Sequence, residues 1–259
     1  GYNALVAVTT GDSNSTLGFG SGDALTTGHN NVAVGIGAIG VSTNVGYAVA
    51  LGDTALGAGN ATDAADGTVA IGSSALRVLT SGAANVAIGK DSGKALTTGA
   101  HNTFLGTTTG DDMVEGSYNI AIGSDALGGA KDGTADASQF NIFIGVNSGN
   151  GAWVTAVSQY NVGVGSYTLD GAMNGAVNNT AVGHKGLSAI TTGDSNVAVG
   201  YQSGLALTTG HSNVIIGENA GSTATTQLTN SVLIGNDAGQ TAVSANHVFI
   251  GDHAGAAAV

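Results

Sequence analysis

The sequence predicts an all-β fold, a β-solenoid or β-roll of about 15 short coils, and three observations lead to this prediction. A short apolar run that closes with glycine recurs along the whole chain, most often at a spacing of 17 residues. Two apolar positions in each run are separated by one residue, which is the period of a β-strand. No segment shows the apolar period of a helix over ten residues. Residues 1–259 are therefore expected to form a single repeat array, and because Gly1 falls in mid-repeat we expect a segment of a longer fibre protein.

Each repeat begins with three residues that precede the closing glycine, such as Val-Ala-Val before Gly35. The first and third of these residues are nearly always β-branched or Leu, so the alternation of a strand places them on one face. We expect this face to point into the coil and to form ladders of apolar side chains. The residue before the run is Asn in ten of fourteen repeats, and stacked amides can hydrogen-bond along such a ladder. The closing glycine is expected to turn the chain with a positive φ.

The segment after the closing glycine predicts the rest of the coil. The third residue after the glycine is small in every repeat, and the fourth is mostly Gly, Leu or Ile. Several repeats then carry Leu-Thr-Thr-Gly, as at residues 25–28, 96–99 and 207–210. This segment is expected to form a second short strand and a second corner.

The middle residue of each three-residue run is unusual, because it should face water yet is nonpolar in thirteen of fourteen repeats. The chain offers no other segment that could cover such a face, so we expect another chain to cover it. Three copies around an axis would do so with closed symmetry, whereas the alternative is a monomeric solenoid with one flat apolar face. The expected oligomer interface consists of Ala33, Ala50, Ala70, Ala87, Phe104, Ala121, Phe143, Ala181, Ala198, Ile215, Leu233 and Phe249.

These repeats resemble those of two families of extracellular fibres. Residues 196–204 (Asn-Val-Ala-Val-Gly-Tyr-Gln-Ser-Gly), with Thr-Thr-Gly at 208–210, are similar to repeats of bacteriophage tail-fibre proteins. The Val-Ala-Ile-Gly core at 69–72 and 86–89 also resembles the head repeats of trimeric autotransporter adhesins. The resemblance covers essentially the whole chain and implies a parallel homotrimeric fibre, in the virion or outside the cell, that contributes to host attachment. A bacterial surface adhesin or another extracellular filament subunit is the alternative.

Charge and composition exclude several partners. The formal net charge is −12, which argues against binding to nucleic acid or to anionic lipid. No apolar run approaches the roughly 20 residues that a membrane span needs, so no membrane insertion is expected. Cysteine is absent, which removes disulfides and thiolate metal sites. The expected partners are therefore further copies of the chain and a host cell-surface glycan or protein.

No catalytic pattern emerges, so we expect neither an enzyme nor a cofactor or metal site. Residues 89–94 resemble a phosphate-binding loop, but the glycines are four residues apart where that motif needs five. The acidic residues Asp111, Asp112 and Glu115 are interpreted as solvated loop acids, and the six histidines occur singly. Two further alternatives, a glycan depolymerase with carboxylates between chains and an ice-binding Thr face, have less support.

Receptor recognition is expected where repeats carry extra residues, because stacked coils force insertions out at the corners. Three intervals are long, and two of these are consecutive, between Gly123 and Gly165. Aromatic side chains beside amides and charges are a usual surface for binding sugars or proteins. The candidates are Lys131, Asp132, Phe140, Trp153, Gln159 and Tyr160. The alternative is that Trp153 and Phe140 fold back to cap the widened coils.

Overall fold

The computed structural model describes residues 1–129, 137–153, 156–224, 227–242 and 245–256, and it confirms a parallel β-solenoid. The chain divides into two compact units, Gly1–Asp125 and Ala126–Val259, which are described separately. Each coil contributes one strand of three residues. The described residues include one short 3₁₀ helix, η1 (Asp63–Ala65), in the long interval that precedes β4.

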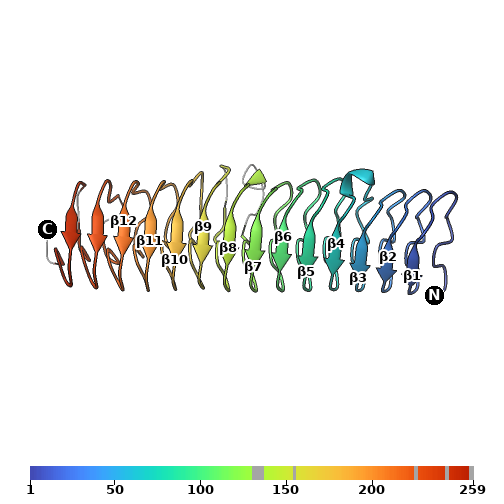
Figure 1. Ribbon diagram of the computed structural model, residues 1–259, viewed down its shortest axis with the longest axis horizontal. Helices are drawn as coiled ribbons and strands as arrows, with labels where there is room; N and C mark the ends of the chain where they lie inside the picture. The colour runs from blue at the N-terminus through green and yellow to red at the C-terminus, as the bar shows by residue number, and fades with distance from the viewer. Residues whose placement is uncertain (130–136, 154–155, 225–226, 243–244, 257–259) are drawn as a thin grey trace. The chain divides into compact units, whose positions relative to one another are not determined.

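The first unit contains seven strands that lie side by side in chain order (Figure 1). Each strand pairs in parallel with the next, in a register that places middle residue beside middle residue, as for Ala33 and Ala50. The strands are β1 (Ser15–Leu17), β2 (Val32–Val34), β3 (Val49–Leu51), β4 (Val69–Ile71), β5 (Val86–Ile88), β6 (Thr103–Leu105) and β7 (Ile120–Ile122).

The second unit repeats this arrangement, with the same parallel pairing and the same register between neighbouring strands. The strand arrows of this unit also point in one direction (Figure 1). Its strands are β8 (Ile142–Ile144), β9 (Val162–Val164), β10 (Thr180–Val182), β11 (Val197–Val199), β12 (Val214–Ile216), β13 (Val232–Ile234) and β14 (Val248–Ile250).

The second short strand that Leu-Thr-Thr-Gly predicts does not form. At residues 25–28 the chain turns instead, and one carbonyl of the next coil, that of Thr43, accepts bonds from the amides of Thr26, Thr27 and Gly28. The Thr26 hydroxyl donates to the same carbonyl at 3.0 Å. A single acceptor shared by three successive amides defines a corner, because a strand would spread its amides over alternate partners.

The closing glycine of each run adopts a positive φ, as expected, and the coil spacing adds a second requirement. At Gly35 φ is 138°, and a Cβ added there would lie 2.2 Å from the carbonyl oxygen of Gly52 in the next coil. The same clash recurs at Gly200, where the Cβ would lie 2.4 Å from the Gly217 oxygen. Glycine is therefore needed at this corner both for its conformation and for the close approach of successive coils.

The Asn ladder is confirmed, and all of its asparagines except the half-buried Asn14 are fully buried. The Asn196 side-chain amide donates to Asn179 Oδ1 at 2.9 Å and to the Gly210 carbonyl at 2.9 Å. In turn, Asn196 Oδ1 accepts the backbone amide of Asn213 at 3.2 Å and its side-chain amide at 2.9 Å. Because the Asn196 amide has partners in the coils on either side, the ladder satisfies polar groups that burial would otherwise make costly.

The strand faces point the opposite way from the sequence-based expectation. The middle residues are buried: Ala33, Ala198 and Phe104 have no exposed surface, whereas the flanking Val197 and Val199 remain about one-third exposed. The predicted oligomer interface of middle residues is therefore wrong, because these side chains lie inside their own coil. The physical reason is the width of the coil: a three-residue strand can direct either one or two side chains inward, and this narrow interior accepts one.

The residues that the sequence wrongly assigned to the oligomer interface lie in the interior. Fully buried are Ala33, Ala50, Ala70, Ala87, Phe104, Ala121, Phe143, Ala181, Ala198, Ile215 and Leu233, and Phe249 of the last strand is half-buried.

The interior is filled by pairing each middle residue with the fourth residue after the closing glycine. Where the middle residue is Ala, as at Ala50, that fourth residue can be Leu or Ile, as at Leu56. Where the middle residue is large, as at Phe104, the fourth residue is glycine, and a Cβ at Gly110 would lie 2.8 Å from the Phe104 ring. Gly93 of the preceding coil makes room for the same ring. The volumes thus compensate from coil to coil, as close packing requires.

Candidate assembly face

Each strand presents its first and third residues outward, and together these residues form what we call the ladder face of each unit. The ladder face comprises residues 15, 17, 32, 34, 49, 51, 69, 71, 86, 88, 103, 105, 120 and 122 in the first unit. In the second unit it comprises residues 142, 144, 162, 164, 180, 182, 197, 199, 214, 216, 232, 234, 248 and 250. The parallel register aligns these side chains into two continuous rows in each unit.

The ladder face is almost entirely aliphatic. Of its 28 residues, 25 are Val, Ile or Leu, and the other three, Ser15, Thr103 and Thr180, are uncharged. None of these residues is fully buried, and many large ones are at least 36% exposed, including Leu105 and Ile144. A chain with a net charge of −12 thus carries no charge along a strand surface of 14 coils. Apolar patches of this extent mark interaction sites on soluble proteins.

The free energy available from covering this face is large. Full burial of a Val, Leu or Ile side chain stabilises by about 1.5–3 kcal/mol, so covering the exposed third gives about 0.5–1 kcal/mol per residue. Eleven aliphatic residues of the ladder face are at least 36% exposed, and covering them gives about 5–11 kcal/mol per copy, which is comparable with the about 4–15 kcal/mol cost of association. Parallel sheets in other folds are covered on both faces for the same reason.

Exposed aromatic side chains stack in pairs along the corner that precedes the strand. His101 and Tyr118 lie with ring centroids 4.9 Å apart and an interplanar angle of 11°. Phe140 and Tyr160 lie 5.2 Å apart at 5°. Each pair joins neighbouring coils, because the members occupy the same repeat position, five residues before a closing glycine. At this corner each unit therefore carries a stacked aromatic pair that joins neighbouring coils.

The structure divides the predicted receptor residues into three groups. Trp153 is fully buried and packs at 5.7 Å, edge to face, against Phe143, so it is part of the core, as the alternative interpretation expected. Phe140 and Tyr160 are exposed, at 40% and 53%, and Gln159 is partly exposed and forms a parallel bridge with Val177. Lys131 and Asp132 lie outside the described residues.

Two of the charged residues singled out in the sequence form an ion pair. Lys94, the last residue of the stretch that resembles a phosphate loop, binds Asp111 of the next coil at 2.7 Å between Nζ and Oδ2. Burial raises the pKa of the Asp111 carboxyl, while its hydrogen bond to Lys94 acts in the opposite direction. The geometry is thus that of a partly buried ion pair between coils.

Within the described ranges, no three His, Asp or Glu side chains gather in a way that could hold a metal ion. No described helix has the length and apolar character needed to cross a bilayer.

Sequence reasoning missed the ladder face because it assumed that Val and Ile point inward and Ala outward. A compensation in volume could have corrected this assumption. A large middle residue occurs with glycine four positions after the closing glycine, whereas a middle Ala can occur with leucine there. Only side chains that share one interior compensate in volume in this way.

Comparison with protein-family models, with curated proteins and with solved structures gives no match.

Proposed function

We propose that this chain is a structural segment of an extracellular fibre in which three parallel copies pack their ladder faces around a common axis. A phage tail fibre that contributes to host-cell attachment is the favoured biological setting, on the basis of the resemblance of the repeats. A bacterial surface adhesin is the alternative setting. The observation that carries the proposal is the uncharged double row of Val, Ile and Leu side chains on the outside of each unit.

A further copy of the same chain is the partner that fits this surface. The rows repeat with the spacing of parallel strands, about 4.8 Å per coil, and a partner must match that period over many coils. Another copy presents the same period along the same length. Self-association also places aliphatic rows against aliphatic rows, without burying any charge of the ladder face. Closed symmetry with three copies leaves no ladder face open to water, and it avoids the open-ended growth of a head-to-tail contact.

The proposal assigns the chain a structural role, because the buried asparagines of the ladder are used in stacking the coils. The Asn ladder and the Thr hydroxyls bond to the neighbouring coils, and Lys94 and Asp111 bond to each other. The alternative of a glycan depolymerase can be tested directly by incubating the chain with host surface polysaccharide. Release of reducing ends that a single Asp or Glu substitution abolishes would assign a depolymerase instead.

Host contact is proposed for the exposed aromatic pair Phe140 and Tyr160 together with Gln159. The two rings are stacked and exposed, in the part of the chain where the intervals are longest. Replacing both rings with Ser should reduce binding to host cells and leave the assembly intact. Tyr118→Ser is the matched control, since it removes an exposed ring from the same repeat position in the other unit.

The decisive experiment for the assembly is sedimentation equilibrium of the native chain over a range of concentrations. Three times the 24.8 kDa mass of one chain supports the proposal, and twice that mass would replace the trimer by a face-to-face pair. A monomer with full β content at every concentration would refute self-association. The surrounding reading frame then separates the two settings, since a downstream chaperone domain favours a phage fibre and a downstream membrane anchor favours an adhesin.

A further inference from the structure

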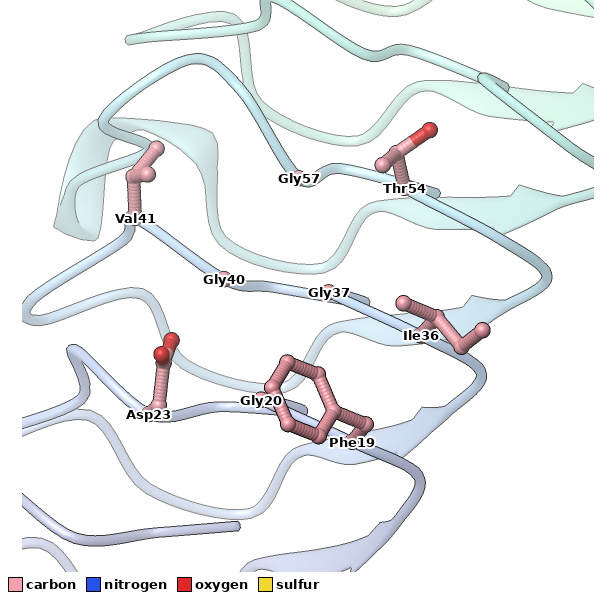
Figure 2. A pocket seen from close by; sticks show the side chains of 9 residues that line it. All are labelled: Phe19, Gly20, Asp23, Ile36, Gly37, Gly40, Val41, Thr54 and Gly57. Atoms are coloured by element: carbon pink, nitrogen blue, oxygen red, sulfur yellow. The ribbon is translucent and has the colours of Figure 1, made fainter. Parts of the chain in front are cut away.

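A shallow pocket of about 250 Å³ lies in the first unit and spans three successive coils (Figure 2). It lies on the segments that follow the closing glycines, whereas the ladder face lies on the strands that precede them. In Figure 2, Phe19 and Ile36 stand on one side and Asp23 and Val41 on the other, with glycines between them. The lining residues are Phe19, Gly20, Asp23, Ile36, Gly37, Gly40, Val41, Thr54 and Gly57.

Two of the glycines, Gly20 and Gly37, create a hollow that the fold does not need. Both occupy the second position after a closing glycine, with φ of 61° and 59°. Side chains fill the same position in the adjoining coils, where Asn3 and Thr54 have φ of 56° and 51°. A Cβ added at Gly20 would come no closer than 3.4 Å to another atom, and at Gly37 no closer than 3.7 Å. The adjoining coils hold side chains in this same conformation, so the two glycines leave space that a side chain would fill.

The rim of the hollow is apolar. Phe19, Ile36 and Val41 are 57%, 60% and 43% exposed, which is high for side chains of this size. Tyr2 stacks against Phe19, with ring centroids 5.7 Å apart and an interplanar angle of 11°, so the Phe19 ring has a packed neighbour in the preceding coil. The pocket therefore offers an ordered aromatic ring and two aliphatic side chains to a ligand.

One carboxylate completes the pocket. No hydrogen bond or ion pair joins Asp23 to another residue in the part of the chain that the structure describes. An atom placed where a Cβ of Gly20 would lie is 3.4 Å from Asp23 Oδ2, so a methyl-sized group in the hollow lies in contact with the carboxylate. The nearby Thr54 hydroxyl donates to the Asp53 carbonyl at 2.8 Å, which leaves Asp23 as the main unengaged polar group.

We propose that this pocket binds the trimethylammonium group of a choline-like ligand. The unpaired carboxylate and the net charge of −12 favour a cation. Methyl groups on the cation match the apolar rim and the exposed Phe19 ring, and aromatic rings attract quaternary ammonium ions through their faces. A primary ammonium ion is strongly hydrated and gains less from such walls. The proposal does not rest on the assembly, because its residues lie outside the ladder face.

The test is a calorimetric titration of the native chain with three related ligands. Choline is the probe, 3,3-dimethylbutan-1-ol is its neutral isostere, and ethanolamine is its hydrated primary counterpart. We expect choline to bind about tenfold more tightly than either comparator. Equal binding of the neutral isostere would show only an apolar hollow, and equal binding of ethanolamine would show only charge attraction. Either result, or no binding of choline, overturns the proposal.

Two variants with matched controls locate the site. Gly37→Asn fills the hollow with a residue that tolerates the required φ, and we expect it to weaken choline binding at least about tenfold. Gln202→Asn, at the same coil position in the second unit, should leave binding unchanged. Asp23→Asn should reduce choline to the affinity of its isostere, whereas Asp53→Asn removes an exposed charge nearby and should not. Unaltered binding in Gly37→Asn or Asp23→Asn refutes the site, while sedimentation of each variant reports separately on assembly.

Discussion

The double substitution Val197→Glu and Val199→Glu on β11 should dissociate the assembly without unfolding the coil. In one chain the two valines are 36% and 37% exposed, so a glutamate at either position can extend its carboxylate into water. The folded chain should therefore lose only about 0.5 kcal/mol per site, as for other surface changes. In the proposed trimer the same positions meet their symmetry copies. There the variant loses about 0.5–1 kcal/mol of burial per valine and adds unpaired, desolvated like charges that cost several kcal/mol.

Sedimentation velocity measures the assembly, and far-ultraviolet circular dichroism measures the β content of the same samples. We expect the native chain to sediment as an oligomer and the variant as a monomer with native β content. Thr192→Glu is the matched control, because Thr192 is an exposed corner residue away from the ladder face, and it should remain assembled. A variant that still assembles, or a native chain that never does, contradicts the assignment of the ladder face. Ala121→Glu would be a poor test, since Ala121 is buried and its loss would unfold the coil.

Three further predictions concern the coil itself. Phe104→Ala should lower the free energy of unfolding by about 3–5 kcal/mol, and adding Gly110→Leu should restore part of this loss, because Ala50 with Leu56 already fills a coil that way. Denaturant unfolding of both variants checks this, and additive losses would contradict the volume compensation. Asn196→Leu should cost more than about 3 kcal/mol, since it leaves several ladder groups without partners; a near-neutral effect on the melting temperature would contradict the ladder's role. Burial raises the pKa of the half-buried Asp170 carboxyl above its ordinary value, so stability should fall as pH rises from the ordinary value through the raised one, and Asp170→Asn should flatten this pH dependence of the melting temperature.

Much of the fold could be predicted from the sequence, because a repeat shows its local requirements many times. The spacing of the closing glycines located the strands, since each strand occupies the three residues before such a glycine. The positive φ at Gly35 and the stacked amides of Asn179 and Asn196 follow from residue chemistry alone. The composition also indicated correctly that both faces of the strand are apolar. The second strand expected at Leu-Thr-Thr-Gly was wrong, because a turn and a strand of three residues have similar local patterns.

The direction of the strand faces was decided only by the tertiary structure. Alternation shows that Val197 and Val199 share a face opposite Ala198, but it does not show which face is inside. The width of the coil settles this, since one Ala per strand fits the interior beside the side chains that follow the closing glycine. The same packing places Trp153 in the core against Phe143, although its position in a long interval suggested a surface role. Both outcomes depend on how much volume one coil encloses, which is a property of many residues packed together and cannot be inferred from the pattern of any one repeat.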